Sequence, residues 1–198
     1  MPGKADATRE RIMQSARERF SREGFERTTI RAVAADAAID PALVMRYFGS
    51  KEGLFAAASE IDLELPDLRA VPRGEVGRRL AANFVERWET GPSAGALKVL
   101  LRTATSNEAA RERLREIFEQ QLMRMLSSAV PKAEVPARAS LVATQILGLA
   151  LCRYILQLPP IVALSPKALA DDIAPTLERY LFGDITSART VRGRSARR

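Results

Sequence analysis

Hydrophobic residues recur along the chain at intervals of three and four, and this spacing predicts helices from end to end. Ile12, Ala16 and Phe20 illustrate it, since residues four apart lie on one face of a helix. We find no useful run of alternating hydrophobic and polar residues, which would indicate a strand, and no internal repeat. The pattern therefore predicts an all-α fold of about nine helices.

The first four predicted helices are closely spaced. They cover residues 6–23, 30–37, 41–48 and 51–64. Gly24 and Gly49 follow the last turns of the first and third predicted helices, where a left-handed C-cap favours glycine. Asp6 is placed to cap the first helix. Asp40 is placed to cap the third, with Pro41 at its first helical position.

Five longer helices follow, separated by Pro- and Gly-containing dipeptides. They cover residues 75–89, 93–106, 108–129, 136–157 and 166–181. Pro66 and Pro72 bracket the boundary between the two groups of helices. We therefore expect one domain over 6–66, a second over 67–184, and a disordered basic tail over 185–198.

The second and third helices, joined by a turn of three or four residues, form a helix-turn-helix. Their shared inner face is apolar, and consists of Ile30, Val33, Ala34, Ala37, Ile39, Val44 and Phe48. The outer face of the third helix carries Ala42, Met45 and Arg46, flanked by Leu43 and Tyr47. An eight-residue helix is about 12 Å long, and it fits a DNA major groove that is about 12 Å wide.

Three residues on this outer face suit contacts with base edges. Arg46 can donate two hydrogen bonds to guanine O6 and N7, and Ala42 and Met45 can contact thymine methyl groups. The alternative for Arg46 is a solvated arginine on a surface helix.

Three further residues suit contacts with phosphates. They are Thr29, Tyr47 and Lys51, of which Lys51 lies in the first turn of the fourth helix, where main-chain amides favour an anion. Each also has a purely structural alternative, such as helix capping by Thr29 or packing of Tyr47 under Phe48.

Residues 8–63 resemble the DNA-binding domain of the tetracycline-repressor (TetR) family of bacterial transcription regulators. The resemblance rests on ARERFSREGFERTTIRAVAADAAI and on YFGSKEGLF. It implies that the domain over 6–66 is a DNA-binding domain with a three-helix head. It also implies that the fourth helix links this head to an all-helical body, the domain over 67–184, that binds a ligand and dimerises. By position, it makes the DNA-facing residues Thr29, Ala42, Leu43, Met45, Arg46, Tyr47 and Lys51.

The chain departs from this family pattern at two positions of the turn. Ala38 stands where glycine is favoured, so the residue either keeps φ below zero or accepts about 1 kcal/mol of strain. Asp40 replaces the usual Ser or Thr cap, and its negative charge disfavours a nearby phosphate.

The body resembles the family in layout alone. By that layout the last two helices, 136–157 and 166–181, pair with their symmetry mates as a four-helix bundle and make a homodimer. The run LVATQILGLALCRYILQL supports this, because it is apolar around most of its circumference and therefore needs burial on two sides. Its small residues Ala143, Gly148, Ala150 and Cys152 allow close approach.

A small apolar or amphipathic effector is expected to bind between helices of the body. Candidate pocket residues are Phe84, Trp88, Leu101, Phe118, Leu122, Met125 and Tyr154. At helical spacing such residues are more often ordinary core, and that alternative stays open.

The composition argues against an enzyme. The 198 residues include no histidine and a single cysteine, Cys152, which removes His-dependent nucleophile systems, His-ligated metals and thiolate clusters. No phosphate-binding glycine loop is present. We therefore predict no catalytic residue, no metal site and no cofactor.

The net charge of +7 is concentrated at one end of the chain. Residues 1–63 carry ten basic and ten acidic side chains, whereas residues 185–198 carry five arginines and no acid. The case for DNA binding therefore depends on where charges lie rather than on their total. The charged N-terminal segment and the polar residues within 141–158 argue against a signal peptide or a membrane span, and favour the cytoplasm.

These patterns predict a sequence-specific regulator, a repressor that a small effector releases from a palindromic double-stranded operator. Two alternatives remain at this point. One is a helical protein-interaction adaptor that has lost its effector response, and the other is an enzyme built on the helical body.

Overall fold

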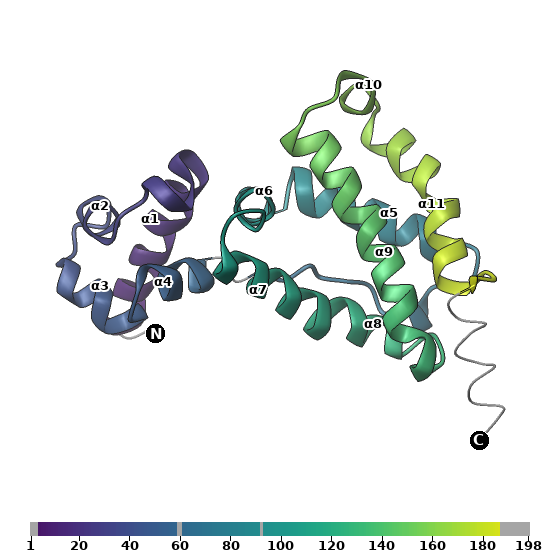
Figure 1. The fold of residues 1–198 in the computed structure, drawn as a ribbon, viewed down its shortest axis with the longest axis horizontal. Coiled ribbons are helices and arrows are strands. Elements are labelled where there is room, and N and C mark those ends of the chain that lie inside the picture. Colours follow the sequence, from purple (N-terminus) through teal and green to yellow (C-terminus); the bar gives the residue numbers. More distant parts are fainter. Residues whose placement is uncertain (1–3, 59–60, 92, 187–198) are drawn as a thin grey trace. The chain divides into compact units, whose positions relative to one another are not determined.

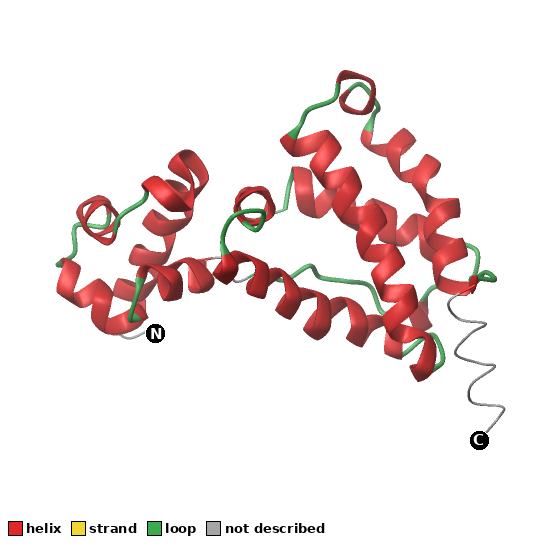
Figure 2. Ribbon diagram, in the orientation of Figure 1, coloured by secondary structure: helices red, strands yellow, loops and turns green. Residues whose placement is uncertain are grey.

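The computed structural model describes residues 4–58, 61–91 and 93–186. Within these ranges every regular element is a helix, and none is a strand (Figure 2). The predicted all-α fold is confirmed. The elements group into two compact units: the first joins residues up to 62 with 93–114, and the second joins 63–92 with the residues from 115 onward.

The first unit holds the predicted helix-turn-helix (Figure 1). Its helices are α1 (Lys4–Arg27), α2 (Ile30–Asp36), α3 (Pro41–Phe48), α4 (Lys51–Ala58), α6 (Ala94–Thr103) and the first part of α7 (Glu108–Ile117). The rings of Phe20, Phe25 and Phe55 form its core. Phe55 meets Phe20 edge-on at 5.0 Å between centroids, and meets Phe25 at 5.1 Å. These contacts join α1 to α4.

Helix α6 packs on α1, so this unit extends beyond the boundary expected near residue 66. The sequence placed α6 in the second domain because chain order alone does not reveal which helices pack together.

The second unit is a helical bundle. Its helices are η1 (Leu68–Ala70), α5 (Val76–Glu89), η2 (Phe118–Met123), α8 (Arg124–Ser127), η3 (Lys132–Glu134), α9 (Val135–Ala150), η4 (Leu151–Ile155), α10 (Pro159–Val162) and α11 (Pro166–Phe182). Its core includes Leu80, Leu126, Val142, Leu177 and Leu181, all buried.

Helices α5 and α11 lie unusually close together at Gly77. A Cβ atom there would come within 2.2 Å of the Ala174 carbonyl oxygen, so only glycine allows this approach. Glu178 on α11 strengthens the contact, because its carboxylate accepts hydrogen bonds from the main-chain amides of Gly74 (2.7 Å) and Gly77 (2.6 Å) at the start of α5.

Several helix ends differ from the sequence prediction. Helix α4 is described only to Ala58, and the chain is not helical from Ile61 to Leu65, where helix was expected as far as residue 64. Glu64 has a left-handed φ of 46°, and Pro66 disfavours helix at the residue before it. Helix α1 already includes Lys4, so Asp6 lies in its first turn and does not cap it.

Three more features were not predicted. Helices expected over 108–129 and 136–157 contain the π-helical stretches η2 and η4, and the short helix α10 follows the second of them. The predicted disordered tail covers residues 185–198. Residues 187–198 lie outside the described part of the chain, whereas Ile185, at the start of the predicted tail, is buried.

The segment Lys132–Ile155 is long and apolar enough to cross a membrane by length and composition, with a mean hydropathy of 1.5. Its arginines, however, have partners inside the second unit. Arg138 donates to the carboxylate of Glu134 and to the carbonyl oxygens of Tyr180 (2.8 Å) and Gly183 (3.2 Å). This is the arrangement of a helix packed within a protein bundle.

Candidate DNA-binding surface

The ends of the two motif helices are fixed by side-chain caps that the sequence predicted. The Thr29 hydroxyl accepts a hydrogen bond from the Ala32 amide (3.1 Å), and the Asp40 carboxylate accepts one from the Ala42 amide (2.7 Å). Gly49 ends α3 with a φ of 73°, as its position indicated. Local sequence therefore sets where α2 and α3 begin and where α3 ends.

The turn between these helices contains a strained residue. Ala38 has a φ of 51°, a left-handed conformation that costs an alanine about 1–2 kcal/mol. Of the two outcomes that the sequence left open for Ala38, the chain adopts the strained one. The Arg11 guanidinium on α1 supports the turn by donating to the carbonyl oxygens of Ala37 (2.6 Å) and Ala38 (3.3 Å).

Arg11 is a positioning residue that the sequence analysis missed. It lies 26 residues before its partner in the chain, and its partners are main-chain carbonyls, which carry no sequence signal. It links α1 to the turn, and so helps to set the orientation of α3.

We expect replacement of Ala38 by glycine to stabilise the first unit by about 1 kcal/mol, because glycine adopts a positive φ without strain. Thermal and urea unfolding would measure the change. The matched control is Ala35→Gly on α2, where the same substitution should lower the free energy of unfolding by about 0.5–1 kcal/mol. A destabilising A38G variant would contradict the strain argument.

Helix α3 separates a buried face from an exposed face. Val44 is fully buried, whereas Ala42, Met45 and Arg46 are exposed, with Met45 at 43%. Leu43 and Tyr47 are half-buried beside them. The three residues expected to contact bases therefore lie together on the outward face of one helix.

Arg46 is available for a partner outside the chain. Its guanidinium lies 5.9 Å from the centroid of the Tyr47 ring, and no carboxylate among the described residues pairs with it. Arg9 of α1 lies 5.6 Å from the ring of Phe48, the next residue along. Two arginines therefore flank the aromatic pair at the end of α3.

Most other arginines described on α1 are neutralised by carboxylates. Arg19 donates to both oxygens of Asp36 (2.6 and 2.8 Å) and also to Glu23, while Arg17 pairs with Glu10. The hydrogen bonds from Arg19 lower the pKa of Asp36 below its usual value. Arg17 and Arg19 are thus neutralised by carboxylates, whereas no carboxylate among the described residues pairs with Arg46 on α3.

Thr29 and Lys51, the two candidate phosphate ligands outside α3, already have partners. Thr29 is exposed and uses its oxygen as the cap of α2. The Lys51 ammonium donates to the Glu26 carbonyl oxygen (3.1 Å) and lies 4.3 Å from the centroid of the Phe25 ring. An ammonium has three donors and a hydroxyl can also donate, so both residues keep capacity for a phosphate.

The candidate pocket residues fall into three separate places. Phe84, Trp88 and Tyr154 form an aromatic cluster, in which the Trp88 and Tyr154 rings stack at 5.5 Å with an angle of 9°. Met125 belongs to the core of the second unit, and Phe118 and Leu122 pack against that core. Leu101 lies on α6, in the first unit.

The aromatic cluster ends in a half-buried polar contact. The Tyr154 hydroxyl donates to the Glu89 carboxylate (3.1 Å), which also accepts from Arg153 (2.9 and 3.0 Å). Burial, and then the negative charge of Glu89, raise the pKa of Tyr154 well above its usual value. Tyr154 is therefore neutral across the physiological range.

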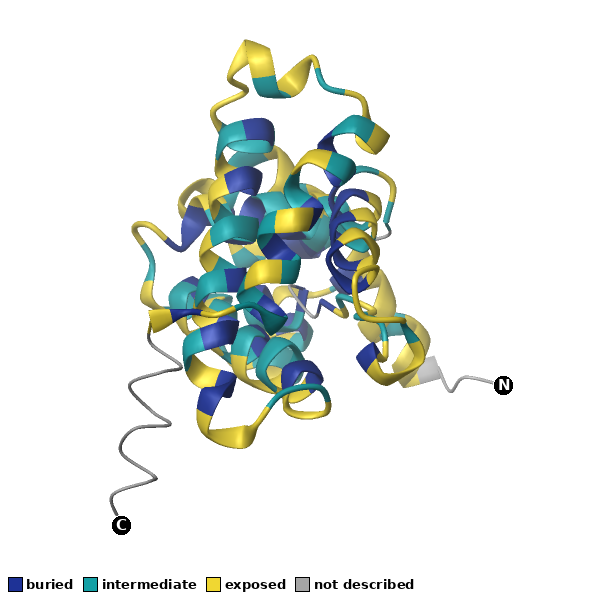
Figure 3. Ribbon diagram, turned by 90° about the vertical axis from the view of Figure 1, so that its right-hand side faces the viewer, coloured by how far each residue is buried: buried dark blue, intermediate teal, exposed yellow. Residues whose placement is uncertain are grey.

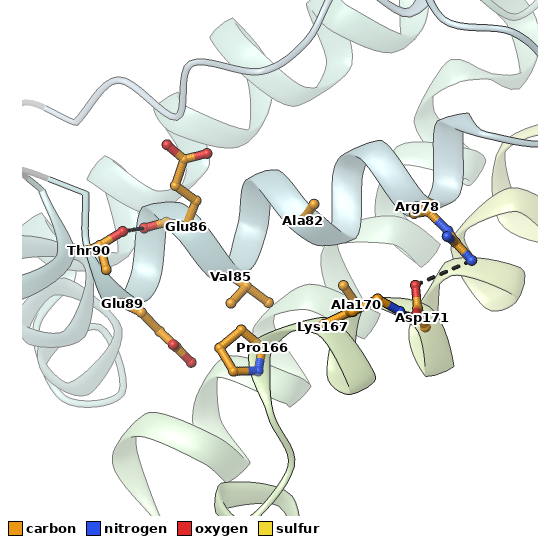
Figure 4. A pocket seen from close by; sticks show the side chains of 10 residues that line it. All are labelled: Arg78, Ala82, Val85, Glu86, Glu89, Thr90, Pro166, Lys167, Ala170 and Asp171. Atoms are coloured by element: carbon orange, nitrogen blue, oxygen red, sulfur yellow. Dashed lines mark hydrogen bonds and ion pairs between the residues drawn. The ribbon is translucent and has the colours of Figure 1, made fainter.

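Glu89 also borders an open groove between α5 and α11, of about 440 Å³ (Figure 4). Val85, Ala82, Ala170 and Pro166 form its apolar floor. Charged groups lie at its two ends, Glu86 and Glu89 at one, and Arg78, Lys167 and Asp171 at the other (Figure 4). None of the seven predicted pocket residues lines this groove.

Comparison with known proteins agrees with this geometry. Residues 12–58 match the family described as "Bacterial regulatory proteins, tetR family", and residues 74–181 match "Tetracyclin repressor-like, C-terminal domain". The chain is 40% identical over 57 residues to the HTH-type transcriptional regulator UidR of Escherichia coli K12. That match spans 29% of each chain, so the chain covers less than a third of UidR's length.

Two solved structures are similar over most of their length. The TetR-family regulator SCO0857 of Streptomyces coelicolor A3 is 29% identical with a TM-score of 0.69, and the match covers 91% of this chain and 97% of that one. Native NalD of Pseudomonas aeruginosa is described as the secondary repressor of the MexAB-OprM multidrug efflux pump. It shares the fold with a TM-score of 0.66 at 18% sequence identity, and the match covers 90% of this chain and 98% of that one. With both parts of the family matched and the helix-turn-helix in place, the chain belongs to the TetR family of DNA-binding transcription regulators.

Proposed function

We propose that this chain is a homodimeric repressor that a small molecule releases from a near-palindromic operator. The observation that carries the proposal is the outward face of α3, where Arg46, Met45 and Ala42 are exposed around the buried anchor Val44. Thr29, Leu43, Tyr47 and Lys51 complete the proposed DNA contacts. NalD, which shares the fold, is described as a repressor, and we carry that role to this chain as part of the proposal.

Binding to the operator requires two copies of α3 in successive major grooves, about 34–36 Å apart. A ligand acts by binding more tightly to a body conformation in which the two heads have a different separation. The change in operator affinity that the ligand can cause is limited by the difference between the ligand's affinities for the two conformations. No chemical step is needed, and the proposed location is the cytoplasm.

We assign dimerisation to α9 and α11, as the family layout implies. Only a third of the apolar window within Lys132–Ile155 is buried in a single chain. Gly148 on α9 is exposed and has open space around the position of a Cβ atom, so a partner helix could approach closely there. An apolar helix with this much exposed surface gains free energy by packing against a second copy.

We assign an apolar or amphipathic effector to the body. The aromatic cluster of Phe84, Trp88 and Tyr154 supplies apolar ring surface in the body. The groove of about 440 Å³ has an apolar floor and the volume of a small-molecule site. Phe118, Leu122 and Met125 of the second unit stay proposed lining residues of this site, and Leu101, which lies in the first unit, stays a prediction from the sequence.

Selection of bound fragments from the source genome tests the proposal. We expect enrichment of a near-palindromic site whose affinity for the purified chain falls steeply with salt, because phosphate contacts release counterions. A library of small apolar and amphipathic molecules is then screened for release of that site. Binding that is weak, insensitive to salt and independent of sequence would instead favour a protein-interaction adaptor.

A further inference from the structure

Helix α2 ends in a Schellman motif, a helix ending that depends on one left-handed residue. The Ile39 amide donates to the Ala34 carbonyl oxygen (2.9 Å). The Ala38 amide donates to the Ala35 carbonyl oxygen (3.1 Å). These two hydrogen bonds define the motif, which places the residue after the helix cap in the left-handed region. That residue is Ala38, with a φ of 51°.

An alanine does not favour this conformation by itself. In the left-handed region its Cβ atom lies too close to the following carbonyl oxygen, which lowers the population of the conformation by about 5- to 30-fold. Glycine carries no such penalty. The φ of Ala38 also sets the direction in which the chain leaves α2, and α3 begins only three residues later, at Pro41. The orientation of α3 therefore depends on contacts that hold Ala38 in place.

Arg11 on α1 supplies such a contact. One nitrogen of its guanidinium, Nη2, donates to the carbonyl oxygens of both Ala37 (2.6 Å) and Ala38 (3.3 Å). The two peptide groups that carry these oxygens rotate relative to each other when φ or ψ of Ala38 changes, so the oxygens converge on one nitrogen in this conformation of Ala38. The positive charge also lies at the C-terminal end of α2, where the helix dipole favours a cation.

A second arginine of α1 fixes α2 itself. Arg19 donates to both carboxylate oxygens of Asp36, the last residue of α2. Arg11 binds the next part of the chain, the turn that leads into α3. Arg11 is exposed, whereas Ile12 and Met13 beside it are buried, in keeping with the mixed colouring of the helices in Figure 3. Helix α1 is thus anchored by its buried face, and its arginines hold both the end of α2 and the turn.

We propose that Arg11 keeps Ala38 in its left-handed conformation and thereby holds α3 in the orientation that binds the operator. The inference rests on the proposed function, because it takes the outward face of α3 as the DNA-contacting surface. Arg11 acts through the turn and is a positioning residue. Its loss should weaken binding to the operator without removing any contact with DNA.

The Arg11→Met variant tests the proposal in gel-shift titrations with the selected operator and with random-sequence DNA. Methionine keeps an unbranched side chain but has no hydrogen-bond donor. We expect operator affinity to fall at least tenfold, because each head adopts the binding orientation for a smaller fraction of the time. The control is Arg17→Met, which removes the same charge from α1, where Arg17 pairs with Glu10. The control should bind the operator within twofold of native, and both variants should bind random-sequence DNA alike.

The double variant R11M/A38G separates positioning from direct contact. Glycine adopts the left-handed turn without help from Arg11, so we expect operator affinity to return to within threefold of native. The slope of log affinity against log salt concentration should also match the native slope. If Arg11 instead bound a phosphate, A38G would not restore affinity, and the slope would be shallower by about 1 for each head.

Circular dichroism checks that each variant keeps its helices. Should R11M lose them, Arg11→Lys and R11K/A38G take its place, because lysine keeps the charge but lacks the planar fork. R11K should then lose operator affinity, and A38G should restore it.

Operator affinity of a folded R11M, or of R11K in its place, within twofold of native would overturn the inference. Failure of A38G to restore binding, or a shallower salt dependence of the double variant, would overturn it as well. In each of these cases, operator binding by the native chain would leave the proposed function standing. A native chain that binds no operator would instead remove the proposed function itself.

Discussion

The Arg46→Ala variant is expected to lose its preference for the operator while it remains a folded dimer. Arg46 is exposed on the outward face of α3 and has no carboxylate partner among the described residues. A bidentate arginine–guanine contact contributes about 1–3 kcal/mol of discrimination, and a dimer would lose two of them. We therefore expect operator affinity to fall by about 30-fold or more in a gel-shift titration, with random-sequence DNA bound almost as before.

The Arg46→Lys variant separates charge from geometry. Lysine keeps the positive charge but lacks the planar fork, so discrimination should fall while the dependence of binding on salt stays close to native. The control is Arg79→Ala, which removes an exposed arginine from α5 in the second unit. Native operator affinity in the R46A variant would refute the assignment of Arg46.

The Arg138→Met variant is expected to lose about 3–5 kcal/mol of stability. Arg138 and Glu134 are each only 2% exposed, and their side chains form an ion pair at 2.8 Å. Removing one partner leaves a buried carboxylate without its counter-ion and removes the donors that bind the Tyr180 and Gly183 carbonyl oxygens near the end of α11. For a chain of this size, we expect the Tm to fall by about 6–20 °C in a circular-dichroism melt.

Two further variants test the cause of this loss. Replacing both partners, as in E134L/R138M, should recover part of the stability, because no charge is then left buried. Recovery should be incomplete, since the two carbonyl oxygens still lack donors. Lys167→Ala breaks the exposed Lys167–Asp171 pair and should cost less than about 1 kcal/mol. An R138M variant as stable as K167A would contradict the importance of burial.

Local signals in the sequence predicted the motif closely. Thr29 and Asp40 cap α2 and α3, and Gly24 and Gly49 adopt the positive φ that their positions after helices indicated. These features depend on hydrogen bonds and steric limits within four or five residues. The exposure of Ala42, Met45 and Arg46 followed in the same way, because the helical period determines which side chains share a face.

Non-local features were not predictable. Arg11 supports the turn from 26 residues away, Arg138 reaches Gly183 from 45 residues away, and Arg153 reaches Glu89 from 64. Before the fold is known, each of these looks like an ordinary charged helix residue. The candidate pocket residues show the same limit: Phe84 and Trp88 are buried and Phe118 and Tyr154 are half-buried, yet Leu101 lies in a different unit from the other six.

The sequence by itself determined the all-helical class, the helix-turn-helix, its caps and the family resemblance, because helix formation and capping depend on neighbouring residues. Tertiary structure alone decided the packing of α6 on α1, the burial of Arg138 and Arg153, and the exposure of Leu156 and Val162 beside η4 and α10. These depend on which distant surfaces meet, and on whether the free energy gained there exceeds the cost of burying charge or straining the backbone.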